Sequence, residues 1–317
     1  MAGRVNPLLD LAARGFGLGI ELRRRARAAG LTRGHRVAAR VISIGNLTVG
    51  GAGKTTLTLY LAQQARARGI AASVVCRRYR PGPAGSSDEE LLYRAAIGAD
   101  AVHAGRSKWR LAEAAAASGS SLVFVDDGFS HWALERDVEV VLVDATDPFG
   151  GGRLLPAGRL REPLRALERA TWVIVSRAAD PEVARSVTEA VKPYAPAARF
   201  AAGHHALTGI TTLGGEPSAA RGRAHVVTAT GNPEAVVASA RAAGFAPVTL
   251  AAYRDHHWFS KREAARERAA SGDGCVLLTR KDAVRWPLGA DGVRVIDVEW
   301  AWTLGGEAAE AMLLARE

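Results

Sequence analysis

The sequence predicts an α/β protein of two lobes, each built on a parallel sheet that helices cover on both faces. Short apolar, β-branched runs alternate along the chain with alanine- and arginine-rich helical stretches, in two successive series. This alternation of strand and helix is typical of parallel βαβ units. A glycine-rich turn joins the first of these strands to a helix. The chain of 317 residues is 48% hydrophobic and 23% charged, which is enough for two cores.

The first and larger lobe is expected to span residues 1–201. Its predicted strands are the apolar runs at 41–45, 73–77, 122–126, 138–144 and 172–176. The clearest helices between them cover 56–69 and 108–118, and an amphipathic helix over 7–29 precedes the first strand.

The second, smaller lobe is expected over residues 224–301. Its predicted strands lie at 225–230, 247–251, 274–279 and 293–298, with helices near 233–243 and 260–271. The segment 202–223, rich in Gly, Thr and Ala, is interpreted as a connector that contains some strand. A C-terminal helix over 302–317 is a candidate to return to the first lobe.

An excess of positive charge favours an anionic partner. Lys and Arg number 42 against 32 Asp and Glu, a net charge of +10. Nucleic acid, an anionic membrane surface and a phosphorylated substrate would each suit it. Nucleic acid is the weakest of the three, because the sequence has no recognisable reader motif. The basic helix over 7–29 can lie in a membrane interface or pack on its own lobe, and no apolar run of about 18 residues predicts a membrane span.

The stretch 41-VISIGNLTVGGAGKTTLTLYLA-62 predicts a phosphate-binding loop between a strand and a helix. Backbone amides and the helix N-terminus would face the phosphates. Lys54 would reach the β- and γ-phosphates, and the Thr55 hydroxyl would bind Mg²⁺. The generic pattern G-x-x-x-x-G-K-[ST] fails at one position, where Thr48 replaces the first glycine. We therefore expect a P-loop NTPase-like lobe whose nucleotide lies on Thr48, Val49, Gly50, Gly51, Ala52, Gly53, Lys54 and Thr55.

A second strand, in 122-LVFVDDGFSHWALERD-137, ends in two carboxylates. A strand-terminal Asp that faces a phosphate loop is the usual second anchor for the metal. If the strand stays extended, Asp126 and Asp127 point to opposite sides, so either could bind Mg²⁺ directly. A solvated turn is the alternative for an isolated Asp pair. The expected metal ligands are Thr55, Asp126 and Asp127.

A basic loop follows at 150-GGGRLLPAGRLREPL-164. Its Arg153, Arg159 and Arg161 carry forked guanidiniums that suit phosphate groups of a substrate or of a nucleotide. A solvated basic loop would have the same composition.

The stretch 253-YRDHHWFS-260 places an acid beside His256 and His257. A histidine is the natural proton acceptor for a sugar or alcohol hydroxyl. A zinc site is less favoured, because no further Cys/His cluster accompanies the pair. A surface pair that caps the following helix is the structural alternative.

Together these stretches resemble one family, the tetraacyldisaccharide 4'-kinases of Gram-negative bacteria. The matching pieces occur in the family's order and span most of the chain: 43-SIGNLTVGGAGKT-55, 126-DDGFSH-131, 136-RD-137, 149-FGGGRLLPAGRLREPL-164, 231-GNP-233, 255-DHH-257 and 279-TRKDAV-284. Thr48 is the residue that this family carries in its variant phosphate loop.

The resemblance implies transfer of the γ-phosphate of ATP, with Mg²⁺, to the 4'-hydroxyl of a tetraacylated disaccharide 1-phosphate, which gives lipid IVA. It implies two α/β/α lobes joined by a short two-stranded connector. It also implies a peripheral position on the cytoplasmic face of the inner membrane, helped by the basic N-terminal helix. The expected partners are a glycolipid substrate and an anionic membrane surface, without nucleic acid.

By the same resemblance an Asp–His pair serves as the base. The histidine corresponds to His256. The acid belongs to the family's G-D-E-P motif, whose nearest match is 87-SDEE-90, so Asp88 is the candidate. The expected catalytic residues are His256, Asp88 and Lys54.

A nucleotide-switch ATPase of the chromosome-partitioning type is the alternative, because G-G-A-G-K-T-T recurs in such proteins. They typically have a lysine where this chain has Val49, and they have no reason to carry the D-H-H stretch.

Overall fold

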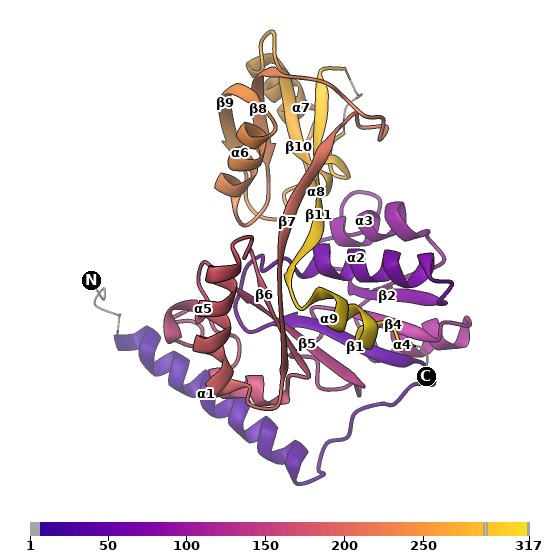
Figure 1. Cartoon of the computed structure of the whole chain (residues 1–317), viewed down its shortest axis with the longest axis vertical. Helices are drawn as coiled ribbons and strands as arrows, with labels where there is room; N and C mark the ends of the chain where they lie inside the picture. The colour runs from indigo at the N-terminus through magenta and orange to yellow at the C-terminus, as the bar shows by residue number, and fades with distance from the viewer. Residues whose placement is uncertain (1–6, 288, 290, 316–317) are drawn as a thin grey trace. The chain divides into compact units, whose positions relative to one another are not determined.

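The computed structural model describes residues 7–287, 289 and 291–315, which form two compact units. Unit 1 comprises the chain up to Arg77, Asp100–His204 and the chain from Trp300 onward, and unit 2 comprises Arg78–Ala99 and His205–Glu299 (Figure 1). We had expected 78–99 within the first lobe. It belongs to unit 2 because α3 (Asp88–Ile97) packs against α8 (Arg280–Ala283) of that unit.

Unit 1 contains a sheet in the order β3-β2-β4-β1-β5-β6-β7. Every pairing recorded between these strands is parallel, which confirms the predicted fold class. The strands are β1 (Arg40–Asn46), β2 (Ala72–Arg77), β3 (Val102–Gly105), β4 (Leu122–Asp126), β5 (Val138–Asp144), β6 (Trp172–Ser176) and β7 (Arg199–Thr211). The sequence did not predict β3, which has only four residues, of which Val102 alone is buried.

The helices of unit 1 are α1 (Pro7–Ala28), α2 (Lys54–Ala67), α4 (Lys108–Ala117), α5 (Pro181–Val191) and α9 (Gly306–Leu313), with short 3-10 turns at Gly150–Gly152, Leu164–Arg169 and Lys192–Tyr194. The C-terminal helix begins at Gly306 and not at 302, because β11 (Val293–Leu304) continues up to a left-handed residue, Gly305. Its last carbonyls, those of Met312 and Leu313, each accept a 2.9 Å hydrogen bond from the guanidinium of Arg40 on β1.

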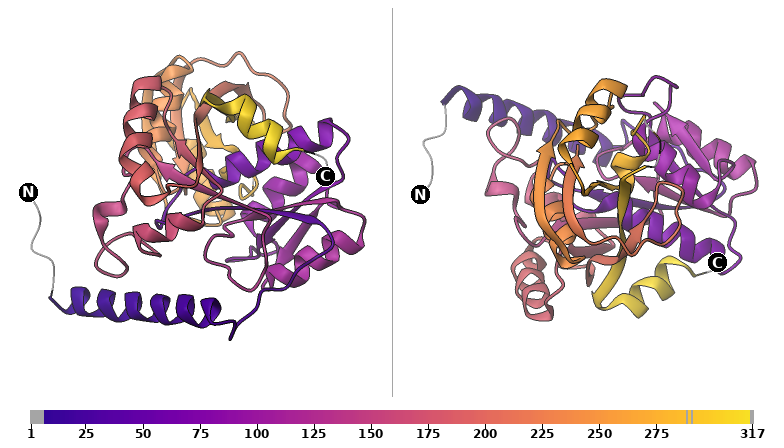
Figure 2. Two further views of the ribbon diagram at one scale, coloured as in Figure 1. Left: turned by 60° about the horizontal axis from the view of Figure 1, so that its bottom comes forward. Right: turned by 90° about the horizontal axis from the view of Figure 1, so that it is seen from above.

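Helix α1 lies along unit 1 and buries little of its surface (Figure 2). Glu21 pairs with Arg165 at 2.7 Å, and Arg27 donates to the Trp132 carbonyl at 2.5 Å. One stripe of the helix is apolar and exposed, and consists of Leu8, Leu11, Leu18 and Leu22. None of the described helices combines the length and the apolar character that crossing a membrane requires.

Unit 2 contains strands in the order β11-β10-β8-β9, again with parallel recorded pairings. They are β8 (Gly222–Thr228), β9 (Phe245–Ala252), β10 (Cys275–Thr279) and β11, with helices α3, α6 (Pro233–Ala242), α7 (Lys261–Ala270) and α8. Strands β7 and β11 each pass from one unit into the other. The segment expected as a connector, 202–223, therefore contains the second half of a long strand and the start of β8.

Candidate active site

The phosphate loop and the Asp126–Asp127 pair lie at the same edge of the unit 1 sheet. Strands β1 and β4 are parallel neighbours, and Ile44 is level with Asp126. The Gly128 amide donates to the Ile44 carbonyl at 3.2 Å. The loop after β1 and the acidic turn after β4 therefore begin side by side, at the carboxyl ends where ligands of parallel sheets bind.

The loop has a conformation that presents its amides to a ligand. Gly50 and Gly53 have φ angles of 114° and 89°, a region that favours glycine. Gly53 is the N-cap of α2. Within the described part of the chain, the amides of Gly50, Gly51, Ala52 and Gly53 find no acceptor. Free amides at a helix N-terminus are the usual cradle for phosphate oxygens.

Thr48 occupies a position that does not need glycine. It is bridged to Leu160 of the basic loop in antiparallel fashion, and the next amide, of Val49, donates to the Arg159 carbonyl at 2.8 Å. Thr48 is not among the residues with positive φ. The G-R-L-L-P-A-G-R-L-R-E-P-L loop thus acts as a short strand partner that holds the start of the phosphate loop extended.

Lys54 is held by a residue that sequence reasoning missed. Its Nζ donates to Asn46 Oδ1 at 2.9 Å and lies 3.6 Å from Asp127 Oδ1. Burial lowers the pKa of Lys54, and the charges of Asp127 and Asp126 oppose that shift. Asn46 ends β1 directly before the loop, so its position in the motif was the available signal.

Asp126 and Asp127 are not related by the alternation of an extended strand. Strand β4 ends at the buried Asp126, and Asp127 has a left-handed φ of 51°. Its carboxylate accepts hydrogen bonds from the two terminal guanidinium nitrogens of Arg161, at 2.7 and 2.9 Å. Burial would raise the pKa of Asp127, but the hydrogen bonds of Arg161 and the charge of Lys54 lower it below its usual range.

Lys108, at the start of α4, is a second residue that sequence reasoning missed. It is buried, and its Nζ donates to the backbone carbonyls of Asp126 and Asp127 at 2.7 and 2.5 Å. Burial lowers its pKa. A lysine on a helical stretch carries no sequence signal for this role. Lys108 fixes the backbone from which both carboxylates project.

The three arginines of the basic loop have different partners. Arg161 is engaged with Asp127 and donates to the Asn46 carbonyl at 3.0 Å. Arg159 pairs with Asp147 at 2.9 Å, and Arg153 lies 3.5 Å from Asp10 of α1. Arg159 also donates to the Val49 carbonyl of the phosphate loop at 3.1 Å. Arg161 therefore borders the expected metal ligand Asp127, Arg159 borders the phosphate loop, and, within the described residues, Arg153 contacts neither.

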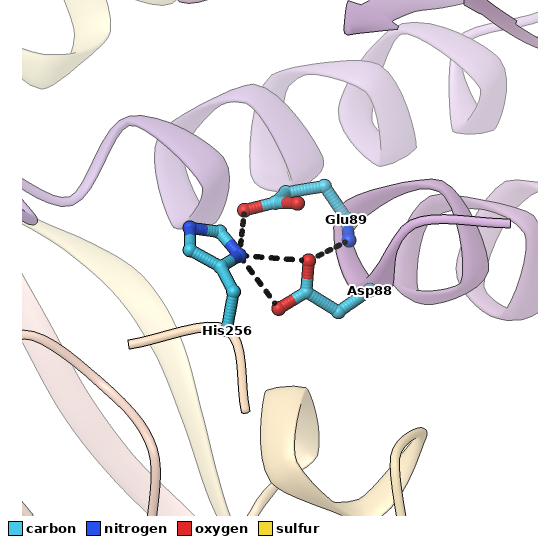
Figure 3. A group of neighbouring side chains, drawn as sticks. All are labelled: Asp88, Glu89 and His256. Carbon is cyan, nitrogen blue, oxygen red and sulfur yellow. Dashed lines mark hydrogen bonds and ion pairs between the residues drawn. The ribbon is translucent and has the colours of Figure 1, made fainter. Parts of the chain in front are cut away.

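In unit 2 the structure brings Asp88 and His256 together across 168 residues of sequence (Figure 3). His256 Nδ1 lies 3.0 and 3.1 Å from the two carboxylate oxygens of Asp88. Asp88 is the first residue of α3, directly after its N-cap Ser87, and is buried. His256 follows β9 with a left-handed φ of 63°. An Nδ1–H that donates to Asp88 leaves Nε2 as the basic atom of the ring.

Two cations balance the carboxylates around this pair. Lys281 Nζ lies 2.8 Å from Glu89 and 3.6 Å from Asp88, and Arg285 lies 3.2 Å from Asp88. Burial opposes ionisation of Asp88, but side-chain hydrogen bonds with His256 and with the Glu89 carboxyl group, together with the charges of the two cations, lower its pKa strongly. Burial and the neighbouring Asp88 raise the pKa of Glu89.

Asp88, Glu89 and His256 offer ligand atoms within 4.8 Å of one another, so a metal is the competing interpretation of this cluster. Lys281 and Arg285 already pair with its two carboxylates, and Arg285 is shared with Asp282 at 2.6 Å. A divalent ion would have to overcome their repulsion, so the charge pattern favours the oriented imidazole.

Similarity to known proteins covers nearly the whole chain. The family model described as tetraacyldisaccharide-1-P 4'-kinase, LpxK, matches residues 5–316. A tetraacyldisaccharide 4'-kinase of Syntrophobacter fumaroxidans is 36% identical over 315 residues, covering 90% of this chain and 81% of that protein. One from Anaeromyxobacter dehalogenans is 35% identical over 338 residues, covering 97% and 89%. Among solved structures, LpxK of Aquifex aeolicus in complex with ATP has the same fold, with a TM-score of 0.72 at 19% identity and coverage of 95% and 96%.

Proposed function

The chain belongs to the tetraacyldisaccharide-1-phosphate 4'-kinase family, and we propose that it transfers the γ-phosphate of ATP to the 4'-hydroxyl of a tetraacyldisaccharide 1-phosphate. The observation that carries this proposal beyond family membership is the 3.0 Å contact between His256 and a buried Asp88, which is the arrangement of a base held by a carboxylate. The chromosome-partitioning alternative is not favoured, since the family match extends through both units.

In unit 1 the loop 48–55 binds the triphosphate through its free amides, and Lys54 offsets the charge of the phosphoryl group in transfer. Hard oxygen donors suit Mg²⁺, and Thr55, Asp126 and Asp127 are the residues that would hold it. When bound, the ion would polarise the transferring phosphoryl group and offset part of its negative charge. Arg161 restrains Asp127 in a defined orientation before any ligand binds.

In unit 2 His256 Nε2 accepts the proton of the sugar hydroxyl. Asp88 accepts the hydrogen bond of Nδ1–H, which selects the tautomer and stabilises the imidazolium that forms. Lys281 and Arg285 keep Asp88 ionised in its buried position. The protein forms no covalent bond to the phosphoryl group, so positioning and electrostatics provide most of the rate enhancement.

The activity is tested with purified full-length protein, labelled ATP, Mg²⁺ and the disaccharide 1-phosphate in detergent micelles. We expect a doubly phosphorylated lipid that depends on both the acceptor and Mg²⁺. ATP hydrolysis that is unchanged by the acceptor, with no labelled lipid, would contradict the proposal and favour a nucleotide switch.

Helix α1 is the basis for proposing a peripheral position on the cytoplasmic face of the inner membrane. The exposed Leu8, Leu11, Leu18 and Leu22 form one apolar stripe, and Arg24 and Arg25 carry exposed positive charge near the helix end. A helix of this kind lies in the interface of an anionic bilayer.

Replacing the four exposed leucines of α1 by serine should weaken flotation with vesicles of anionic lipid, and the remaining binding should fall with added salt. The matched control replaces Val183 and Leu207, which are also exposed but lie outside α1. Equal flotation of the wild type and the four-leucine variant would assign α1 to packing alone.

A further inference from the structure

The two residues of the proposed base come from segments that must be aligned with each other. Asp88 belongs to the segment Arg78–Ala99, and His256 to the loop after β9. Both segments lie in unit 2. Catalytic groups need alignment to within a fraction of an ångström, and the contact between the two side chains does not provide it alone.

A tryptophan beside His256 contacts the other segment directly. The Nε1–H of Trp258 donates to the Arg80 carbonyl at 3.1 Å. Its ring lies over Gly82 so closely that a Cβ at that position would be 2.5 Å from Cη2 and 2.6 Å from Cε2 and Cε3. Gly82 has no positive φ, so the ring, and not the backbone conformation, demands glycine there.

Two further contacts join the same segments. The guanidinium of Arg80 donates to the Asp255 carbonyl at 3.2 Å. The ring of Tyr79 meets that of His256 edge to face, with centroids 5.5 Å apart. Arg80 and His256 both have left-handed φ angles, of 44° and 63°. Such conformations persist in residues other than glycine where surrounding contacts enforce them.

Gly82 is connected to Asp88 by a compact turn. Its amide donates to the Ser86 carbonyl at 2.9 Å, and the Gly85 amide donates to the Gly82 carbonyl at 2.9 Å. Ser87 then caps α3, and Asp88 is its first residue. A displacement of Gly82 would therefore also move the Asp88 carboxylate.

From this geometry we propose that Trp258, seated on Gly82, is a positioning residue that aligns Asp88 with His256. The inference rests on the proposed function, since it assigns the alignment to that base. Trp258 is half-buried and does not belong to the core of unit 2, whereas the adjacent Phe259 does. Removing the indole should thus disturb the loop more than the fold.

Kinetics of the full chain test the proposal through a mutant cycle. Trp258→Ala should lower kcat by about 10- to 100-fold, because misplacement by about 1 Å has effects of that size, and should leave the KM for ATP unchanged. Trp258→Phe, which keeps a ring over Gly82, should recover most of the loss.

Gly82→Ala should lower kcat in the wild-type background. It should cause no further loss in the Trp258→Ala background, where its methyl group has space. Gly209→Ala, with no atom near its Cβ position, is the matched control and should behave as wild type.

A readout independent of activity is the NMR signal of the His256 Nδ1 proton, assigned by its loss in His256→Gln. This signal should be sharp in the wild type and broadened by exchange in Trp258→Ala and Gly82→Ala. Wild-type kcat and an unchanged signal in both variants would overturn the inference while the kinase activity stands. A protein without kinase activity whose signal still broadens in both variants would support the alignment and contradict the proposed function.

Discussion

The phosphate-loop region of unit 1 and the Asp88–His256 region of unit 2 differ in how their charges balance. Three cations, Lys54, Lys108 and Arg161, lie around Asp126 and Asp127. Around His256, the two cations Lys281 and Arg285 face the carboxylates of Asp88 and Glu89. Asp255 lies 3.6 Å from the ring, and Asp282 shares Arg285. The first region retains a net positive charge, which an anionic ligand would neutralise. In the second region the cations are already paired with carboxylates, and the region offers an oriented imidazole.

The two regions also differ in how far apart their residues lie along the chain. Lys54 and its partner Asn46 are eight residues apart, whereas Asp88 and His256 are separated by 168. Local contacts survive small displacements of the surrounding structure, because few bonds separate the partners. The alignment of Asp88 with His256 depends on many tertiary contacts. Substitutions in the two regions should therefore have different kinetic signatures.

The largest effect is expected from His256→Gln, which should lower kcat by about 10²- to 10⁴-fold because it removes the proposed general base. The KM for ATP should stay near its wild-type value if the second region contributes only to proton transfer. Steady-state kinetics at saturating acceptor measure both constants. His257→Gln, whose ring stacks on Tyr253, is the control and should stay within a few-fold of wild type. Equal loss in both variants would contradict the assignment of the base.

The second-largest effect is expected from Lys54→Met. It should lower kcat by about 10²- to 10³-fold, the usual effect of removing one charge-stabilising group. Unlike His256→Gln, it should also raise the KM for ATP, because the proposed function has Lys54 contact the nucleotide in the ground state. Lys192→Met, which removes an exposed lysine of unit 1, is the control. If Lys54→Met changed kcat alone, the contrast between the two regions would need revision.

Burial, together with the positive charge near the first region, should also affect acid stability through His131. Burial and the nearby Lys108 and Arg136 lower its pKa from 6.5 to about 4. The unfolded chain then binds the proton first as pH falls, so stability is lost between pH 6.5 and 4, by up to about 3 kcal/mol. His131→Phe should remove that part of the pH dependence, as measured by urea unfolding across this range. Parallel curves for the two proteins would show that His131 is not the group responsible.

The smallest of these effects is expected from Asn46→Ala, with kcat/KM for ATP about 10-fold lower. A hydrogen bond to a charged group is worth about 1.5–3 kcal/mol, and part of it is regained from water. The loss should be much smaller than that of Lys54→Met, and the double variant should resemble Lys54→Met alone, because Asn46 acts through Lys54. Additive losses would instead indicate a direct role of Asn46, which also contacts Arg161.

Much of the fold could be predicted from the pattern of the sequence. The elements that this prediction lacked or misplaced have identifiable causes. The predicted strands of both lobes are present, because buried parallel strands form long apolar runs. Helix α5 was missed although Asp180 and Pro181 form a recognisable N-terminus. The segment 78–99 was assigned to the wrong unit, since its packing on α8 depends on residues about 190 positions away, such as the Glu89–Lys281 pair.

The sequence by itself determined the phosphate loop and the family, because the residues that cradle a phosphate are contiguous and their spacing is set by the backbone geometry of one strand, one turn and one helix. Only the tertiary structure decided that Lys108 supports the Asp126–Asp127 turn, that Arg161 restrains Asp127, and that Trp258 seats on Gly82. Those contacts join different elements, from 18 residues apart for Lys108 and Asp126 to 178 for Trp258 and Arg80. Folding brings such polar partners together, and they leave no periodic pattern in the sequence.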